Sequence, residues 1–541
     1  MEQSTHSVPK RRGSAGVRVE TRPIYIEEWL DSLPYIDFNK TSRLILEATT
    51  DTNGEIIKPE DRLELVRLYN RPYLYYLESQ IKTGAQHTLQ SMENMQNQTT
   101  VLKQIAINLA QACKLSMEEG QKRKTVWRQK KSPLPAVMMA MNYLSHALIF
   151  SYLEYSQPPP NIWRELNELF YFAENMGEER KTIVPPGGDA KKDAASITDV
   201  YKKILLASMV DPYHLPFGAI WEIFVQLKSW NTHAEIKPFT RVSQADGCFV
   251  VDLDQDTHPI PYSKFDTDLA GGSHRLINTT ALWNLVNDQM KLLNAGKPLD
   301  DSISLSSFYA KSILKQLSLA WGPPAVRFSP RDRSGGSVYI TCGINGIYYY
   351  LNGSREFESR DTQGEDGVLA DVGGYHEHTP PSVRAAEYLL DQWDLVDQGP
   401  GGFAISKADR PQTPIRVGDL IGIIRDPDPE KAPENLALGV IRWLMISGNK
   451  VYRVGIQTIA ADIHPAAIRA RSGSAMDTRF NRAIIAGDFS SSGDHDIILG
   501  AGMYAPEREF ELQVAGKTMR ASARSPVEST VNFEHFILLV G

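Results

Sequence analysis

Two arginines and a glycine-rich turn are the residues of this sequence whose types and spacing favour ligand chemistry. Arg327 and Arg331 stand four residues apart, in a segment that a proline prevents from being helix interior. Guanidinium groups bind phosphate in a bidentate way and stack on bases. Farther along, Asp397 can accept hydrogen bonds from the donor edge of a guanine, while Gly399 and Gly402 allow close approach to the backbone. Together these residues predict a site for an anionic small molecule that contains guanine.

The order of these residues resembles the PilZ domain, the bacterial receptor module for cyclic di-GMP. That family carries Arg-x-x-x-Arg ahead of a first strand, followed later by Asp/Asn-x-Ser-x-x-Gly. Arg327 and Arg331 match the first element. Asp397-x-Gly399-x-x-Gly402 matches the second, with glycine where the family has serine.

The resemblance implies an antiparallel β-barrel over residues 323–462 and cyclic di-GMP as its ligand. It also implies that Arg327 and Arg331 hold phosphates and stack on guanine, and that Asp397 contacts the guanine edge. Arg333 follows the first element closely and is expected to act as an auxiliary cation. The expected ligand-binding set is therefore Arg327, Arg331, Arg333, Asp397, Gly399 and Gly402. No cofactor beyond this ligand and no metal are expected.

Runs rich in β-branched and aromatic residues supply the strands that such a barrel needs. The predicted strands are residues 337–351, 393–405, 415–425, 438–446 and 451–456. A Ser-Gly-Asn turn separates the last two and predicts a β-hairpin. Their sequences also resemble the closing strands of PilZ domains.

The rest of the chain predicts a multidomain α+β protein. Residues 23–235 should form an N-terminal all-α helical array, because apolar residues recur there with helical spacing. Pro72 is expected to kink or divide one of these helices. A mixed α/β connecting region is expected over residues 236–322, before the PilZ-like antiparallel β-barrel. A C-terminal β extension is expected over residues 463–541, with a short helix at 465–471 and further strands over 497–540. Whether these strands form a second module or extend the first barrel stays open.

Composition and charge narrow the class of protein. The length of 541 residues exceeds one ordinary domain, and the net charge of −7 gives no general reason to expect nucleic acid as a partner. Three widely separated cysteines favour a reducing compartment, so a cytoplasmic protein is expected. Residues 1–22 are expected to be a disordered basic tail, since no apolar segment of a secretory signal follows them.

Four other stretches could be interpreted as functional sites, but their patterns favour a structural interpretation. The basic cluster at residues 122–131 is interpreted as a solvated loop, with nucleic-acid or membrane contact as the alternative. Residues 134–155 predict an apolar core helix, and no transmembrane segment is expected. The His-Glu-His triplet at 376–378 and the Asp-His-Asp triplet at 494–496 lack the spacing of helical metal ligands.

Two hypotheses from different classes remain. No combination of nucleophile, base and orienting group is evident, so no enzyme is expected. In the first hypothesis, a cyclic di-GMP-binding barrel is coupled to a helical domain that contacts a protein partner. In the second, the barrel is a scaffold or adaptor that binds no ligand and acts through protein–protein contacts. The glycine at position 399 keeps the second hypothesis open. The sequence leaves the partner, the controlled process and any oligomer undetermined.

Overall fold

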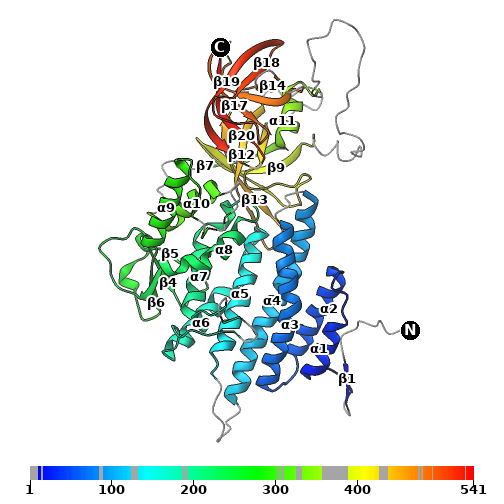
Figure 1. Ribbon diagram of the computed structural model, residues 1–541, viewed down its shortest axis with the longest axis vertical. Helices are drawn as coiled ribbons and strands as arrows, with labels where there is room; N and C mark the ends of the chain where they lie inside the picture. The colour runs from blue at the N-terminus through cyan, green and yellow to red at the C-terminus, as the bar shows by residue number, and fades with distance from the viewer. Residues whose placement is uncertain are drawn as a thin grey trace, which may run out of the picture. The chain divides into compact units, whose positions relative to one another are not determined.

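Two compact units make up the chain. The first comprises Met1–Pro212 and Gly218–Ala325, and the second comprises Tyr213–Phe217 and Val326–Gly541. Helices dominate the first unit and strands the second (Figure 1). The computed structural model describes residues 10–13, 16–84, 89–122, 132–185, 189–190, 193–300, 302–303, 305, 310–323, 332–355, 357, 388–425, 436–472, 475–476, 479–489, 492–530 and 532–541.

The first unit is largely the helical array that the sequence predicts. Its helices are α1 (Pro23–Asp31), α2 (Phe38–Asn53), α3 (Pro59–Gly84), α4 (Leu89–Lys122), α5 (Leu134–Leu153), α6 (Ile162–Asn175), α7 (Ile197–Met209), α8 (Ala219–Trp230), α9 (Thr280–Asn294) and α10 (Ala310–Trp321). Asp37 and Ser196 cap the starts of α2 and α7 by accepting backbone hydrogen bonds, as short polar residues do at helix N-termini. Of the kink or division expected at Pro72, the division does not occur, because α3 runs unbroken through this residue.

α5 is the central helix of the first unit. It packs against α4, α6, α7 and α8, and its buried residues lie on all of its sides. It is long and apolar enough to cross a membrane by length and composition, but 89% of its most apolar window is buried inside the structure. Such burial is typical of the core helix that the sequence predicts.

A small sheet completes the first unit. β3 (Glu235–Pro238), β4 (Cys248–Asp252), β5 (Ile260–Pro261) and β6 (His274–Asn278) pair in the order β3-β6-β4-β5, all antiparallel. Near the N-terminus, β1 (Lys10–Gly13) and β2 (Gly16–Val19) form a hairpin. The expectation of a wholly disordered tail over residues 1–22 is therefore wrong for this segment.

The second unit contains a closed antiparallel barrel, which we call the first barrel. Pairing between β9 and β10 closes the strand order β10-β13-β12-β11-β8-β9 into a ring. The strands are β8 (Ser337–Cys342), β9 (Asp391–Gly399), β10 (Gly402–Lys407), β11 (Leu420–Ile424), β12 (Leu436–Ile446) and β13 (Tyr452–Ala460). A two-residue strand, β7 (Asp332–Arg333), pairs with the outer end of β9.

A second closed barrel follows directly. Its strands are β14 (Ile463–Ser472), β16 (Asn481–Ala486), β17 (Gly493–Leu499), β18 (Glu509–Val514), β19 (Lys517–Ser529) and β20 (Glu534–Val540), with the short β15 (Ala475–Met476) on β14. Pairing between β14 and β18 closes this ring. In both barrels the strands follow one another around the ring in the order first, second, third, sixth, fifth, fourth. The second barrel thus repeats the topology of the first.

Three segments of the second unit differ from the sequence prediction. Residues 393–405 were expected to form one strand, but they fold back after Gly399 into the paired strands β9 and β10. Residues 343–351 were expected to extend a strand, but they form the helix α11 (Gly343–Leu351). Their β-branched and aromatic residues favour a strand, yet Ile344, Ile347 and Leu351 recur with helical spacing, and Ile347 is fully buried. Residues 465–471 were expected to be a short helix, but they belong to β14. β14 has paired strands on both sides, and these ladders override the local preference of an alanine-rich sequence.

The two barrels share one hydrophobic cluster. Leu420, Leu438 and Val440 of the first barrel pack in the same cluster as Ile484 and Phe533 of the second. Burial of apolar surface is worth about 25 cal/mol per Å², so a shared cluster binds the two barrels into one structural unit.

A buried carboxylate lies where the barrels meet. Asp419, just before β11, accepts hydrogen bonds from the backbone N–H of Arg416 at 2.7 Å and from Nδ2 of Asn532 at 2.6 Å. Asn532 precedes β20 in the second barrel. Burial raises the pKa of Asp419 to about 6, although the nearby Arg416 charge opposes the shift.

Because of this raised pKa, the stability of the second unit depends on pH. The pKa of Asp419 rises on folding, so its contribution to stability is present below about pH 4 and is lost as the pH rises through about 6. We expect Asp419→Asn to remove this dependence, which is worth ~3 kcal/mol at neutral pH. The melting temperature of the wild type minus that of Asp419→Asn should fall between about pH 4 and pH 7. Parallel pH profiles for the two proteins would contradict the raised pKa.

Candidate functional site

A tight turn between β9 and β10 carries the second predicted element. Gly399 pairs with Gly402, Gln398 with Phe403, and Asp397 with Ala404. The turn therefore begins directly after Gly399 and presents the half-buried Asp397 from the outer end of β9. We call residues 397–402 the ligand hairpin.

Only glycine fits at position 402. Its φ is +155°, and a Cβ there would lie 2.0 Å from the carbonyl oxygen of Ile456. Ile456 is in β13, which pairs with both β10 and β12 and so is held on both sides. Neighbouring Gly401 has open space around its Cβ position. The glycine at 402 thus allows the ligand hairpin to lie directly on β13.

The structure brings two of the predicted site residues together. In the antiparallel pair of β7 and β9, Arg333 stands opposite Asp397, and Asp332 stands opposite Gln398. Arg333 is exposed, so its guanidinium is accessible to a ligand at the ligand hairpin. Arg327 and Arg331 lie outside the described residues.

The opposite end of β9 is fixed by a buried carboxylate. Asp391 is 3% exposed and forms an ion pair with Lys407 of β10 at 2.9 Å. It also accepts hydrogen bonds from Nε1 of Trp393 and from the backbone N–H of Gln412, both at 3.2 Å. Charge-assisted contacts of this kind hold β9 and β10 in register, and this register sets the position of Asp397.

One cation near the site was not predicted. Arg425, at the end of β11, donates from Nη2 to Oε1 of Gln398 at 3.3 Å. Gln398 lies inside the ligand hairpin, so Arg425 is a further exposed cationic residue in contact with this segment. The two partners are 27 residues apart in the sequence, and no local pattern connects them.

A second sequence signal was readable and was missed. Asp488-x-Ser490-x-x-Gly493 follows the second strand of the second barrel and includes the serine that the ligand hairpin lacks. Gly493 begins β17 as Gly402 begins β10, and both have positive φ. Ser490 lies outside the described residues. The ten residues before β14 contain a single arginine, Arg453, so the second barrel has no arginine pair ahead of its first strand.

The other sequence candidates have ordinary explanations or lie outside the description. The basic residues 123–131 and the triplet at 376–378 are outside the described residues. Within the triplet at 494–496, Asp496 Oδ1 lies 2.7 Å from Nε2 of His535, and the ring of His495 packs against Phe489. No group of three or more potential metal ligands occurs among the residues that the structure describes.

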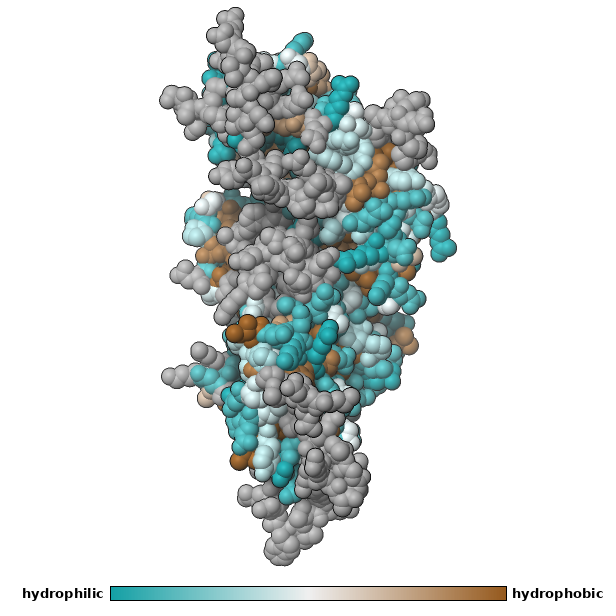
Figure 2. All heavy atoms as spheres, turned by 90° about the vertical axis from the view of Figure 1, so that its right-hand side faces the viewer, coloured by the Kyte–Doolittle hydropathy of each residue, from teal (hydrophilic) through white to brown (hydrophobic). Residues whose placement is uncertain are grey.

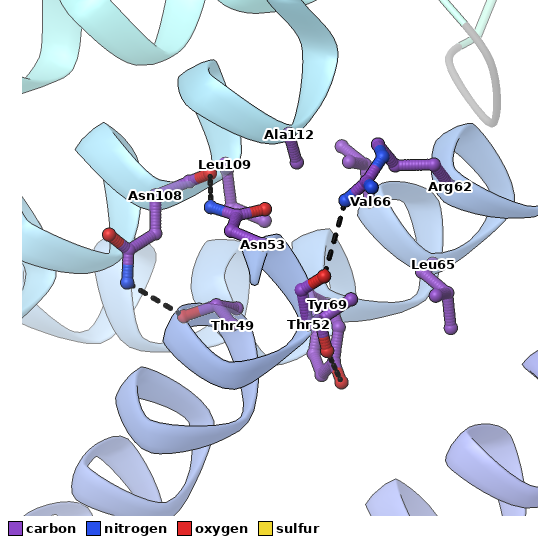
Figure 3. Close-up of a pocket in the computed structure, with 10 residues that line it drawn as sticks. All are labelled: Thr49, Thr52, Asn53, Arg62, Leu65, Val66, Tyr69, Asn108, Leu109 and Ala112. Atoms are coloured by element: carbon purple, nitrogen blue, oxygen red, sulfur yellow. Dashed lines mark hydrogen bonds between the residues drawn. The ribbon is translucent and has the colours of Figure 1, made fainter. Parts of the chain in front are cut away.

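A small polar pocket in the first unit is a structural feature rather than a second site (Figure 3). Arg62 lies at its edge, and its side chain is 1% exposed. The guanidinium donates to Glu119 at 2.6 and 2.9 Å and to the backbone carbonyls of Thr52 and Glu55 at 3.2 and 2.6 Å. These bonds tie α2, α3 and α4 together and leave each guanidinium nitrogen with a partner.

Comparison with known proteins points to one family. The model for the N-terminal domain of the cyclic-di-GMP receptor FimW matches residues 25–241, and the model for its middle PilZ domain matches residues 248–374. The chain is 21% identical to the cyclic-di-GMP receptor FimW of Pseudomonas aeruginosa over 575 aligned positions. That alignment covers 96% of this chain and 90% of the relative. The middle-domain match begins at β4, earlier than the barrel over residues 323–462 that the sequence predicts, and it ends at residue 374, before β9 and the ligand hairpin.

Proposed function

This chain belongs to the PilZ-domain family of cyclic di-GMP receptors, and from that premise we propose that its first barrel binds cyclic di-GMP at the ligand hairpin. The observation that carries the proposal is the placement of Asp397 opposite Arg333, next to a turn that requires glycine at position 402. The same proposal assigns the first barrel, residues 323–462, as the ligand-binding domain.

Each proposed contact follows from the chemistry of the ligand. Cyclic di-GMP has two phosphates and two guanines, and Arg327 and Arg331 are the proposed phosphate and base-stacking groups. Arg331 immediately precedes Asp332 in the sequence, and Asp332 stands opposite Gln398 of the ligand hairpin. The Asp397 carboxylate accepts hydrogen bonds from the guanine N–H groups. Gly399 offers no hydroxyl, so its contact is limited to the backbone.

Asp397→Asn is expected to weaken binding of cyclic di-GMP about tenfold or more, because an amide places a donor against the guanine donors. Asp488→Asn is the matched control, since it makes the same change at the equivalent turn of the second barrel, which lacks the arginine pair. It should leave the affinity unchanged. Calorimetric titration of the full-length protein measures both. A loss of affinity in Asp488→Asn with none in Asp397→Asn would move the site to the second barrel.

We also propose that the helical unit contacts a protein partner. Support comes from large apolar side chains exposed on α1 and α3, among them Ile24 at 63% and Tyr75 at 54%. On the face shown in Figure 2, apolar groups occur in small separate areas among hydrophilic ones. Small separate apolar areas fit a contact that forms and dissociates better than a permanent interface.

A further inference from the structure

Arg442 connects the ligand hairpin of the first barrel to the second barrel. Its Nε donates to Oε1 of Gln457 on β13 at 2.7 Å. Its two terminal nitrogens donate to the two carboxylate oxygens of Glu528 on β19, at 2.5 and 2.8 Å. All three nitrogens of this guanidinium therefore donate hydrogen bonds, Nε to the first barrel and the two terminal nitrogens to the second.

Gln457 lies directly against the ligand hairpin. It is the register partner of Gly402 on one side and of Val440 on the other. The next backbone N–H, of Thr458, donates to the carbonyl oxygen of Gly401 at 3.2 Å. Fixing the Gln457 side chain therefore restrains the part of β13 on which the ligand hairpin lies.

The position of Glu528 is unusual for its segment. Residues 524–527 and 529 are exposed, whereas Glu528 is half-buried, with 26% of its side chain accessible. The pairing of β19 with β20 is irregular on both sides of Pro526. Such irregularities re-aim side chains, and this one directs the Glu528 carboxylate to the first barrel.

We infer that Arg442 is a positioning residue for ligand binding, and that the second barrel controls the affinity of the ligand hairpin through the Glu528–Arg442–Gln457 chain. The inference rests on the proposed function of the ligand hairpin. In this series of contacts, Glu528 fixes the guanidinium of Arg442, and the guanidinium fixes the side chain of Gln457. Gln457 in turn restrains β13, and with it Gly401 and Gly402, in the binding conformation before the ligand arrives. By reciprocity, ligand binding must strengthen the contact between the barrels by the same factor.

The main test uses four variants of the full-length protein. Glu528→Gln removes the ion pair and keeps the shape, whereas Gln457→Ala keeps the ion pair and removes its link to the ligand hairpin. Each, and the Arg442→Gln/Glu528→Gln double variant, should weaken cyclic di-GMP binding about fivefold in calorimetric titration, because they break one chain. Exchanging the charges in Arg442→Glu/Glu528→Arg should restore part of the affinity lost in Glu528→Gln.

Glu511→Gln is the matched control. It removes the same charge from the Arg469–Glu511 ion pair at 2.7 Å within the second barrel, away from the ligand hairpin, so the affinity should not change. Tighter binding in Glu528→Gln would overturn the inference, because it would mean that Glu528 only repels the anionic ligand. Unchanged affinity in Gln457→Ala would overturn it as well.

Hydrogen exchange without ligand separates this inference from the proposed function. Glu528→Gln and Gln457→Ala should speed exchange of the Thr458 amide, which donates to Gly401, while Glu511→Gln should not. If exchange is faster in these variants but the wild type does not bind cyclic di-GMP, the proposed function is wrong. The structural link between Glu528 and the ligand hairpin would still be supported. A wild type that binds, with unchanged exchange in the variants, would sink the inference alone.

Discussion

The Arg327→Ala/Arg331→Ala protein is expected to bind cyclic di-GMP more than about a hundredfold more weakly than the wild type. Each guanidinium–phosphate contact is worth roughly 1.5–3 kcal/mol, and the double variant loses two. Residual binding should also depend less on salt concentration, since fewer charges are paired. Calorimetric titration at two ionic strengths measures both effects.

A matched pair of arginines provides the control for this variant. Arg520 and Arg524 are also four residues apart, are exposed, and lie on β19 of the second barrel. Arg520→Ala/Arg524→Ala removes the same charge and should retain the wild-type affinity. Equal losses in the two double variants would show a general effect of net charge and no site at Arg327 and Arg331.

The same variant decides between effector and scaffold. If the chain is a ligand-gated effector, Arg327→Ala/Arg331→Ala abolishes both ligand binding and the effect of cyclic di-GMP on partner binding. If the barrel is a scaffold, the wild type binds no ligand, and the variant leaves partner binding unchanged. Measuring partner capture with and without cyclic di-GMP, for both proteins, separates the two hypotheses.

Gly402→Ala is expected to destabilise the second unit by about 3 kcal/mol and to abolish ligand binding. The added Cβ would lie 2.0 Å from the carbonyl oxygen of Ile456, and the paired strands on both sides of β13 prevent it from moving away. Thermal unfolding followed by circular dichroism measures the loss. Gly401→Ala is the control, because its Cβ would meet no atom within 4 Å, and it should unfold like the wild type.

Local patterns in the sequence predicted β structure over residues 393–405, because strand-forming residues act over a few positions, but they did not predict that this segment folds back into the ligand hairpin. The same local reasoning failed at α11, where the β preference of the tyrosines concealed the helical spacing of Ile344, Ile347 and Leu351. The closure of the strands into rings could not be predicted from local patterns. The closing strands are far apart in the sequence, as in the pairing of Ala466 in β14 with Val514 in β18. Contacts such as that of Arg425 with Gln398 depend on such pairings.

The site was only partly predictable for a related reason. Asp397, Gly399 and Gly402 could be proposed as site residues because one short segment contains them all. The contact between Arg442 and Glu528 joins residues that are 86 positions apart in the sequence, and it forms only when both barrels are folded against each other. Asp488 and its neighbours differ from this case, because one short segment contains their whole pattern.

The hydrophobic cluster common to both barrels constrains how this chain can evolve. Repeated modules with separate cores can be lost, exchanged or shuffled between genes one at a time. Here, removing the second barrel would leave Leu420, Leu438 and Val440 without the side chains that cover them. Recombination that separates the two barrels is therefore expected to yield an unstable protein, which favours inheritance of the ligand hairpin together with the second barrel.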